Sequence, residues 1–242
     1  MNSSNVLGAM GVIVGLLPYG SALRRLLVGG RTRRLLRLAG GDLDAVLSTN
    51  SEPDGPHTTA VGELRGIAVA TRAVHDAYGR KRIAPHLSHE FRGYPDGDLL
   101  LLGGPSRNAL SARFLADLNL RYPSARLDVD TATGTIGLAG RRFALDGDGG
   151  TPREDLGLVV LARWSGHGRR VLFCAGLSTY GTEGAARYLF QDVLPPCGHN
   201  AQIRRALSAP AAAVVVHVEV RHGRAWRPRI HSDAFWSAAY PS

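Results

Sequence analysis

Two glycine-rich segments carry the residue types and spacing expected of a ligand-binding site. Residues 99–108 and residues 171–182 each read as an apolar run followed by a glycine turn. Each leads into an amphipathic stretch, over 109–118 and 183–193, that predicts a helix. Ligands of open α/β sheets bind where buried strands end in such loops, because the loop and the helix N-terminus present backbone N–H groups. The two segments therefore predict a ligand site.

The candidate ligand-binding residues give these loops conformational freedom, hydroxyl groups or an aromatic face. Glycines let a ligand approach the backbone, Ser106 or Asn108 could cap the first helix, and Tyr180 offers a face for a base or sugar. The candidates are Gly103, Gly104, Ser106, Asn108, Gly176, Ser178, Tyr180, Gly181 and Thr182. The alternative is that the turns serve packing only, and it weighs more for the first loop than for the second.

Two glutamates on the predicted helices are the candidate catalytic acids. Glu63 lies on a helix that Thr58 and Thr59 could cap, and Glu183 is expected in the first turn of the helix after the second loop. A carboxylate in a first helical turn is also favoured by the helix dipole, without any chemical role. The sequence leaves both interpretations of Glu183 open.

Several motifs with established chemistry are missing from the sequence. Neither loop contains Gly-Lys-Ser/Thr or Gly-x-Gly-x-x-Gly, which argues against ATP hydrolysis and NAD-linked hydride transfer. Ser178 lacks the second glycine of a Gly-x-Ser-x-Gly elbow, so a serine nucleophile is not favoured. His86 with His89, and Cys197 with His199, are the nearest approaches to metal-ligand spacing and do not complete a ligand set. We therefore predict no metal and no cofactor.

Charge and length together favour one α/β domain with a basic N-terminal appendage. The 242 residues are enough to bury a sizeable core, and 44% of them are hydrophobic. The formal charge of +9 is concentrated before Asp42, where six arginines and no acid occur. Because the rest of the chain is close to balanced, its charge argues against nucleic acid as a partner of the domain.

The N-terminal segment has the length and hydrophobicity of a single-pass membrane anchor. Residues 6–23 form eighteen positions without a charge, close to the ~20 that cross a bilayer, although Pro18 weakens the pattern. The charges follow this stretch, which favours an inner-membrane location with the globular domain in the cytoplasm. The predicted contacts with anionic lipid are Arg24, Arg25, Arg31, Arg33, Arg34 and Arg37. The alternative is a buried or dimer-forming helix with a solvated basic end.

The order of predicted elements indicates an α/β fold. We expect residues 1–41 as the anchor segment and 42–242 as a Rossmann-like domain. Its fold would be a three-layer, mostly parallel sheet with an antiparallel hairpin insertion near 135–146 and a C-terminal strand pair. The strands are expected at 43–49, 83–88, 98–102, 156–162, 171–175, 211–220 and 225–230, with a first helix bearing apolar residues from 61 to 74.

Three sequence runs resemble a broad group of Rossmann-like nucleotide sensors and processors. They are Gly-Gly-Pro-Ser-Arg-Asn at 103–108, Asp-Leu-Gly-Leu-Val-Val at 155–160, and the run from Ala175 to Ala185. The group includes nucleoside deoxyribosyltransferase-like, TIR-like and CRISPR-associated sensor folds, and the runs are also similar to uncharacterised membrane-tethered actinobacterial proteins. The resemblance covers most of residues 43–220 and implies a fold and a pocket at the strand C-termini. In the glycosidic enzymes of this group an acid on a helix serves the sugar chemistry, and Glu63 or Glu183 could be placed there.

Three functions remain open from the sequence. The first is a membrane-tethered cytoplasmic domain that binds a nucleotide-like small molecule and signals its presence. The second is an enzyme that cleaves or transfers an N-glycosidic bond of a nucleoside or NAD, with Glu183 or Glu63 as the acid. The third is a structural or assembly protein with an unused crevice.

Overall fold

The computed structural model describes the globular part of the chain together with a few residues before it. The described residues are 30, 33–34, 36–39, 42–49, 58–79, 81–91, 97–145, 153–164, 168–192 and 209–238. The predicted anchor at 6–23 lies outside them, as do Arg24, Arg25 and Arg31. Within this part of the chain, no helix combines the length and the apolar character that crossing a bilayer requires.

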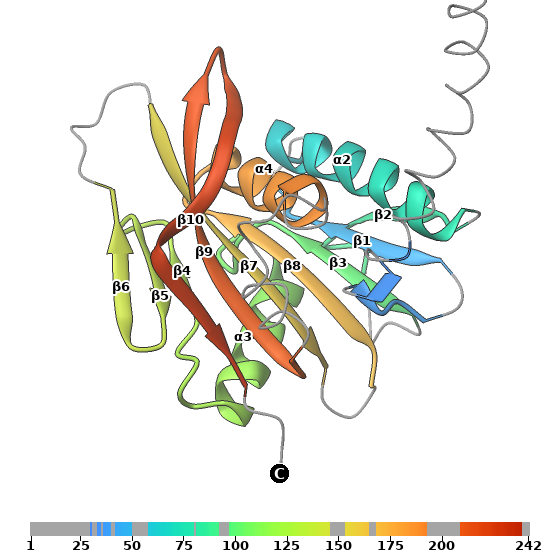
Figure 1. The fold of residues 1–242 in the computed structure, drawn as a ribbon, viewed down its shortest axis with the longest axis horizontal. Coiled ribbons are helices and arrows are strands. Elements are labelled where there is room, and N and C mark those ends of the chain that lie inside the picture. Colours follow the sequence, from blue (N-terminus) through green and yellow to red (C-terminus); the bar gives the residue numbers. More distant parts are fainter. Residues whose placement is uncertain are drawn as a thin grey trace, which may run out of the picture.

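A seven-stranded mixed sheet forms the centre of the molecule, in the order β10-β9-β7-β8-β3-β1-β2 (Figure 1). Strands β8, β3, β1 and β2 run parallel, whereas β7, β9 and β10 join by antiparallel pairing. The strand bounds are β1 Leu43–Leu47, β2 Ile83–Leu87, β3 Asp98–Leu102, β7 Glu154–Arg163, β8 Arg170–Gly176, β9 Ala211–Arg221 and β10 Arg224–Ser237. The predicted α/β class with one large sheet is confirmed.

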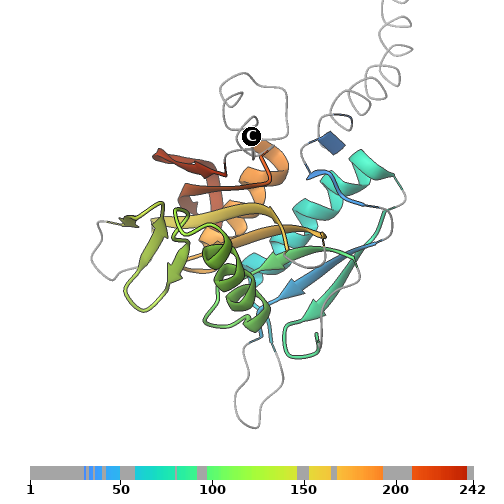
Figure 2. The ribbon, with the colours of Figure 1, turned by 90° about the horizontal axis from the view of Figure 1, so that it is seen from below.

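Helices cover both faces of this sheet (Figure 2). Helices α2 (Val61–Tyr78) and α4 (Thr179–Arg187) lie on one face, and α3 (Ala109–Arg121) lies on the other. Alternate residues of a strand point to opposite faces, so Leu100 and Leu102 pack beneath α2 and α4 while Leu99 and Leu101 pack beneath α3. This coverage explains why the leucine run of β3 is wholly buried.

A second, three-stranded sheet packs beside α3. It contains β4 (Asp128–Asp130), β5 (Thr135–Leu138) and β6 (Arg141–Ala144), in that order and all antiparallel. The β5–β6 turn has positive φ at Ala139 and Gly140, as a two-residue hairpin turn requires. Strand β4 was not predicted, because three residues are too few for a readable alternation.

Two helices begin differently from the sequence prediction. Helix α4 starts at Thr179 rather than 183, because Ser178 caps it by accepting a hydrogen bond from the Tyr180 N–H, and a π-helical turn, Tyr188–Asp192, follows it. Helix α2 has Ala60 as its N-cap, with no side-chain cap. The expected Thr59 cap is wrong, since the Thr59 hydroxyl donates to the carboxylate of Glu63 instead.

Candidate ligand-binding crevice

The two glycine loops face one crevice because the strands that precede them, β3 and β8, are neighbours. The crevice lies at the C-terminal ends of the parallel strands β1, β3 and β8 and has a volume of about 290 Å³. Seven of the predicted residues line it: Glu63, Gly103, Gly104, Ser106, Gly176, Ser178 and Thr182. The sequence therefore located the position of the crevice and about half of its lining.

Six lining residues were not predicted: Ser48, Ala60, Arg107, Thr131, Leu177 and Thr179. Ser48 directly follows β1, so the rule that pointed to the two glycine loops, applied to a third strand, would have found it. Arg107 is the charged residue of the first loop and was visible in the same run. Thr131 comes from the turn after β4 and could not be placed while that strand was unrecognised.

The Glu63 carboxylate is the buried ionisable group of the crevice. It accepts hydrogen bonds from the Ser48 N–H at 2.8 Å, from the Ser48 hydroxyl, and from the Thr59 hydroxyl at 2.9 Å. Burial raises the pKa of Glu63 because the charged form loses water. The hydrogen bonds from Ser48 and Thr59 and the positive charge of Arg107 offset this rise only in part. This acid thus joins the end of β1 to the start of α2 and takes up a proton more readily than an exposed glutamate.

Gly103 allows this acid to reach the end of β3. Its φ of 95° lies in the region that disfavours side chains, and a Cβ there would lie 2.6 Å from the nearer Glu63 carboxylate oxygen and 2.9 Å from the Ser48 Cβ. The glycine therefore has a packing role at this position, and it also brings the backbone of the loop against the carboxylate.

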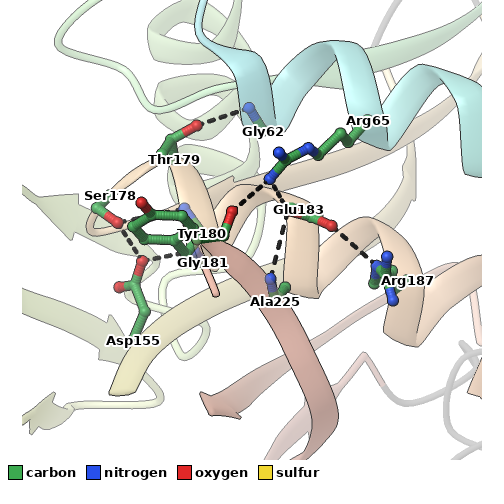
Figure 3. Close-up of polar contacts among 11 residues, drawn as sticks. Gly62, Arg65, Asp155, Ser178, Thr179, Tyr180, Gly181, Glu183, Arg187 and Ala225 are labelled. Carbon is green, nitrogen blue, oxygen red and sulfur yellow. Dashed lines mark hydrogen bonds and ion pairs between the residues drawn. The ribbon is translucent and has the colours of Figure 1, made fainter. Parts of the chain in front are cut away.

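The Asp155 carboxylate, on strand β7, binds the second glycine loop through hydrogen bonds (Figure 3). It is buried at the start of β7, and its carboxylate accepts from the Ser178 hydroxyl at 2.5 Å, the Gly181 N–H at 2.5 Å and the Leu156 N–H at 2.7 Å. Burial raises the pKa of Asp155, and these hydrogen bonds lower it in part. Sequence reasoning missed this residue because its loop partners, Ser178 and Gly181, lie more than twenty positions away.

The three helices that begin at the crevice differ in the charged side chains near their N-termini. Glu63 lies in the first turn of α2, and Asp155 bonds to the first turn of α4. The first turn of α3 has no acid, and the exposed Arg107 precedes its N-cap. The positive end of the α3 dipole and the Arg107 guanidinium therefore make this side the one suited to an anion.

Glu183 lies outside the crevice lining, although it is fully buried. Its carboxylate forms ion pairs with Arg65 at 3.2 Å and Arg187 at 3.0 Å, and accepts from the Ala225 N–H at 3.3 Å (Figure 3). The expected place in the first turn is wrong, because α4 begins four residues earlier. Glu183 thus joins α4 to α2 and to the start of β10.

Three other candidates support the crevice without lining it. Asn108 is buried; it caps α3 by accepting from two backbone N–H groups and donates to the carbonyls of Val46 and Leu102. Gly181 packs against the β7 backbone, where a Cβ would overlap the carbonyl oxygen of Leu156. Tyr180 is partly buried, and its N–H bonds to the capping serine.

Metal-ligating residues do not cluster in the described part of the chain, where no group of three or more histidine, cysteine or acidic side chains is placed to hold an ion. His86 instead bonds through Nε2 to Asp44 at 3.0 Å. Cys197 and His199 lie outside the described residues.

Comparison with known proteins finds no matching family model, no matching curated protein and no matching solved structure.

Proposed function

We propose that this protein is a sensor domain that binds a nucleotide-like small molecule in the crevice. The observation that carries the proposal is that a cationic side chain and a buried carboxylate line the same crevice, at the ends of neighbouring strands. Arg107 and the acid-free start of α3 suit a phosphate, while the buried Glu63 carboxylate suits a sugar hydroxyl. The loop glycines let both contacts form close to the backbone.

A Rossmann-like, three-layer architecture is part of this proposal. It is supported by the four adjacent parallel strands, by α2 and α4 on one face, and by α3 on the other. In such sheets the ligand lies beyond the carboxyl ends of the strands, which is where the crevice is found.

Binding is tested by calorimetric titration of the full-length chain, in mild detergent, with AMP, ATP and NAD. We expect at least one of them to bind, and Arg107→Gln to weaken that binding about tenfold, since a charge-assisted phosphate contact is lost. Arg72→Gln is the matched control, because Arg72 is exposed on α2 and outside the crevice lining. Equal affinities for the wild type and Arg107→Gln would contradict the proposed phosphate position.

An N-glycosidic hydrolase is the second candidate, favoured by the raised pKa of Glu63 inside the crevice. In that reaction on a nucleoside, the protonated carboxyl gives its proton to the departing base, the C–N bond breaks, and water adds to the anomeric carbon and returns a proton to the carboxylate. The test is chromatographic detection of free base after incubation with NAD or nucleosides. Turnover that is lost in Glu63→Gln supports the enzyme, and binding without turnover supports the sensor. Neither binding nor turnover would leave the structural or assembly protein as the better explanation.

Membrane tethering, with the domain in the cytoplasm, is the third part of the proposal. It is supported by the uncharged residues 6–23 and by the arginines that follow them. Of these arginines, Arg33 already contacts α2, donating to the carbonyl of Ala77 and lying over the ring of Tyr78 at 5.7 Å. Fractionation of the full-length chain against a variant that lacks residues 6–23 tests the anchor. A full-length chain that stays in the supernatant would contradict it.

A further inference from the structure

Residues 36–39, the docked segment, are bound to the domain at the end of the sheet where the parallel strands begin. Leu36 is fully buried in the core beside α2, and the Tyr78 hydroxyl accepts a hydrogen bond from the Leu38 N–H at 3.2 Å. The Ala39 N–H donates to the carboxylate of Asp98, the first residue of β3. The chain therefore enters the domain at a fixed position.

Basic side chains gather around the docked segment. The guanidinium of Arg33 lies 5.7 Å from the ring centre of Tyr78, and the ammonium group of Lys81 lies 5.9 Å from it. Lys81 also donates to the Ala39 carbonyl at 2.8 Å, which ties the approach to β2 to the segment. The basic end of the domain, as we define it, consists of these two residues and the exposed Arg34, Arg37 and Arg82. The described acids at this end are fewer: Asp42, Asp76 and the buried Asp98.

The basic end lies opposite the crevice. Strand β3 begins at Asp98, which binds the docked segment, and ends at Leu102, just before Gly103 of the crevice lining. The docked segment and the lining loops therefore lie at opposite ends of the parallel strands (Figure 2). A ligand can thus enter the crevice while the basic end is covered by another surface.

The proposed anchor precedes the basic end closely in the chain. Residues 24–32 separate the end of the uncharged stretch 6–23 from Arg33, so the two lie at most about 35 Å apart even if this link is fully extended. Because the chain enters the domain through the docked segment, the basic end is the part of the domain that a bilayer holding the anchor meets first. Lysine and arginine at such a position are attracted by the phosphate groups of anionic lipids.

We infer that the basic end binds the anionic headgroups of the bilayer and orients the domain with its crevice facing away from the membrane. This inference rests on the proposed membrane tether and adds to it Lys81 and Arg82, which belong to the domain itself. An anchor alone would leave the domain free to turn. The docked segment prevents this, because its hydrogen bonds to α2 and β3 connect the lipid contact to the sheet.

The test is flotation of the full-length chain with two kinds of vesicle, followed by hydrogen exchange. One kind is phosphatidylcholine alone, and the other is equal parts phosphatidylcholine and phosphatidylglycerol. We expect the backbone amides of residues 36–39 and 81–83 to exchange at least about threefold more slowly on the anionic vesicles, because the lipid contact excludes water. Exchange in the crevice loop, 103–107, should be equal on both.

Charge reversal separates the basic end from a general attraction of the positive chain. Arg34→Glu combined with Arg82→Glu should abolish the difference in exchange between the two lipids. Arg142→Glu combined with Arg224→Glu changes the net charge equally, on β6 and at the start of β10, and should retain the difference. All four side chains are exposed, so both variants should melt within a few degrees of the wild type.

Flotation distinguishes failure of the anchor from failure of this lipid contact. A chain that floats with both vesicles but exchanges equally on both keeps the anchor and overturns the inference. A chain that floats with the anionic vesicles alone contradicts the anchor and supports the basic end as a lipid-binding surface. Floating with neither overturns both proposals, and slower exchange of residues 103–107 on the anionic vesicles overturns the orientation.

Discussion

Glu63 and Glu183 are two buried carboxylates on helices that pack against each other, and their surroundings are opposite in kind. Glu63 is 3% exposed and is held by neutral donors from Ser48 and Thr59. Glu183 is 0% exposed and lies between the guanidinium groups of Arg65 and Arg187. The first acid lines the crevice, while the second ties helices together. Burial alone therefore does not separate the two acids; the charge of their partners and access to the crevice do.

The largest expected effect comes from disrupting the contact between α2 and α4, the two helices that carry these acids. Gly62 donates its N–H to the Thr179 hydroxyl at 2.7 Å, and a Cβ at Gly62 would overlap the Thr179 carbonyl oxygen. We expect Gly62→Ala to force α2 away from α4 and to lower the free energy of unfolding by about 3 kcal/mol or more. Urea denaturation measures this. Leu64→Ala, on the exposed face of the same helix turn, is the control and should change stability by less than about 1 kcal/mol. Equal effects of the two substitutions would show that the α2–α4 contact is adaptable.

The second largest effect is expected from Glu183→Gln, which removes the negative charge that Arg65 and Arg187 share. Glu183→Gln leaves Arg65 and Arg187 facing each other without the carboxylate between them. Their side chains are 34% and 27% exposed, so water compensates in part. We expect a loss of about 2 to 3 kcal/mol in the free energy of unfolding, below that of a fully buried pair. Ligand affinity of the folded protein should be unchanged, because Glu183 lies outside the crevice. A stable Glu183→Gln variant with weakened binding would reverse the roles assigned to the two acids.

Glu63→Gln should have the opposite profile, with little change in stability and a large change in function. The amide oxygen can still accept from the Ser48 N–H and the Thr59 hydroxyl, and the amide N–H can donate to the Ser48 hydroxyl oxygen. We therefore expect stability to change by no more than about 1 kcal/mol. Affinity for the crevice ligand, or turnover of an N-glycosidic substrate, should fall at least tenfold. Unchanged binding and turnover would make Glu63 a structural link between β1 and α2.

The smallest effect is a pH dependence that belongs to Glu63 alone. Because burial raises its pKa, the folded state holds this proton at a higher pH than the unfolded state does. Stability contributed by this group is therefore greatest below the ordinary carboxyl pKa of 4.5 and is lost as pH rises through the raised value. Between pH 7 and 4.5, wild type should gain stability relative to Glu63→Gln as pH falls. Asp155 titrates in both proteins, so its effect cancels in the difference. Parallel stability curves would show that Glu63 has the same pKa in both states.

Much of the sheet could be predicted because its strands are covered on both faces. The bounds of β3 match the prediction, since its four consecutive leucines are followed at once by Gly103 and Gly104. The position of the crevice followed from the same pattern. The adjacency of β3 and β8 could not be predicted, because strand order depends on long-range pairing that no local hydrophobic period encodes.

The chemistry of the site was the less predictable part. Local sequence could not separate Glu63 from Glu183. Arg187 lies four residues after Glu183 on the same helix, but Arg65 reaches Glu183 from another helix. Asp155 lies at the start of an apolar strand, where no hydrophobic period or motif marks it as part of a site. The start of α4 was placed four residues too late because Thr179 and Gly181 have weak helix propensity, which the cap by Ser178 overrides.

The direction of β7 decides what holds the second glycine loop. In a wholly parallel sheet, the strand beside β8 would end there with another loop and another helix start. Because β7 runs antiparallel to β8, it begins there and presents Asp155 in place of such a loop. The Asp155 carboxylate accepts from Ser178 and Gly181, so the start of α4 is anchored to a strand of the sheet. A single reversed strand thus ties this part of the crevice wall to the most rigid layer of the molecule, and the loop cannot shift without moving the sheet.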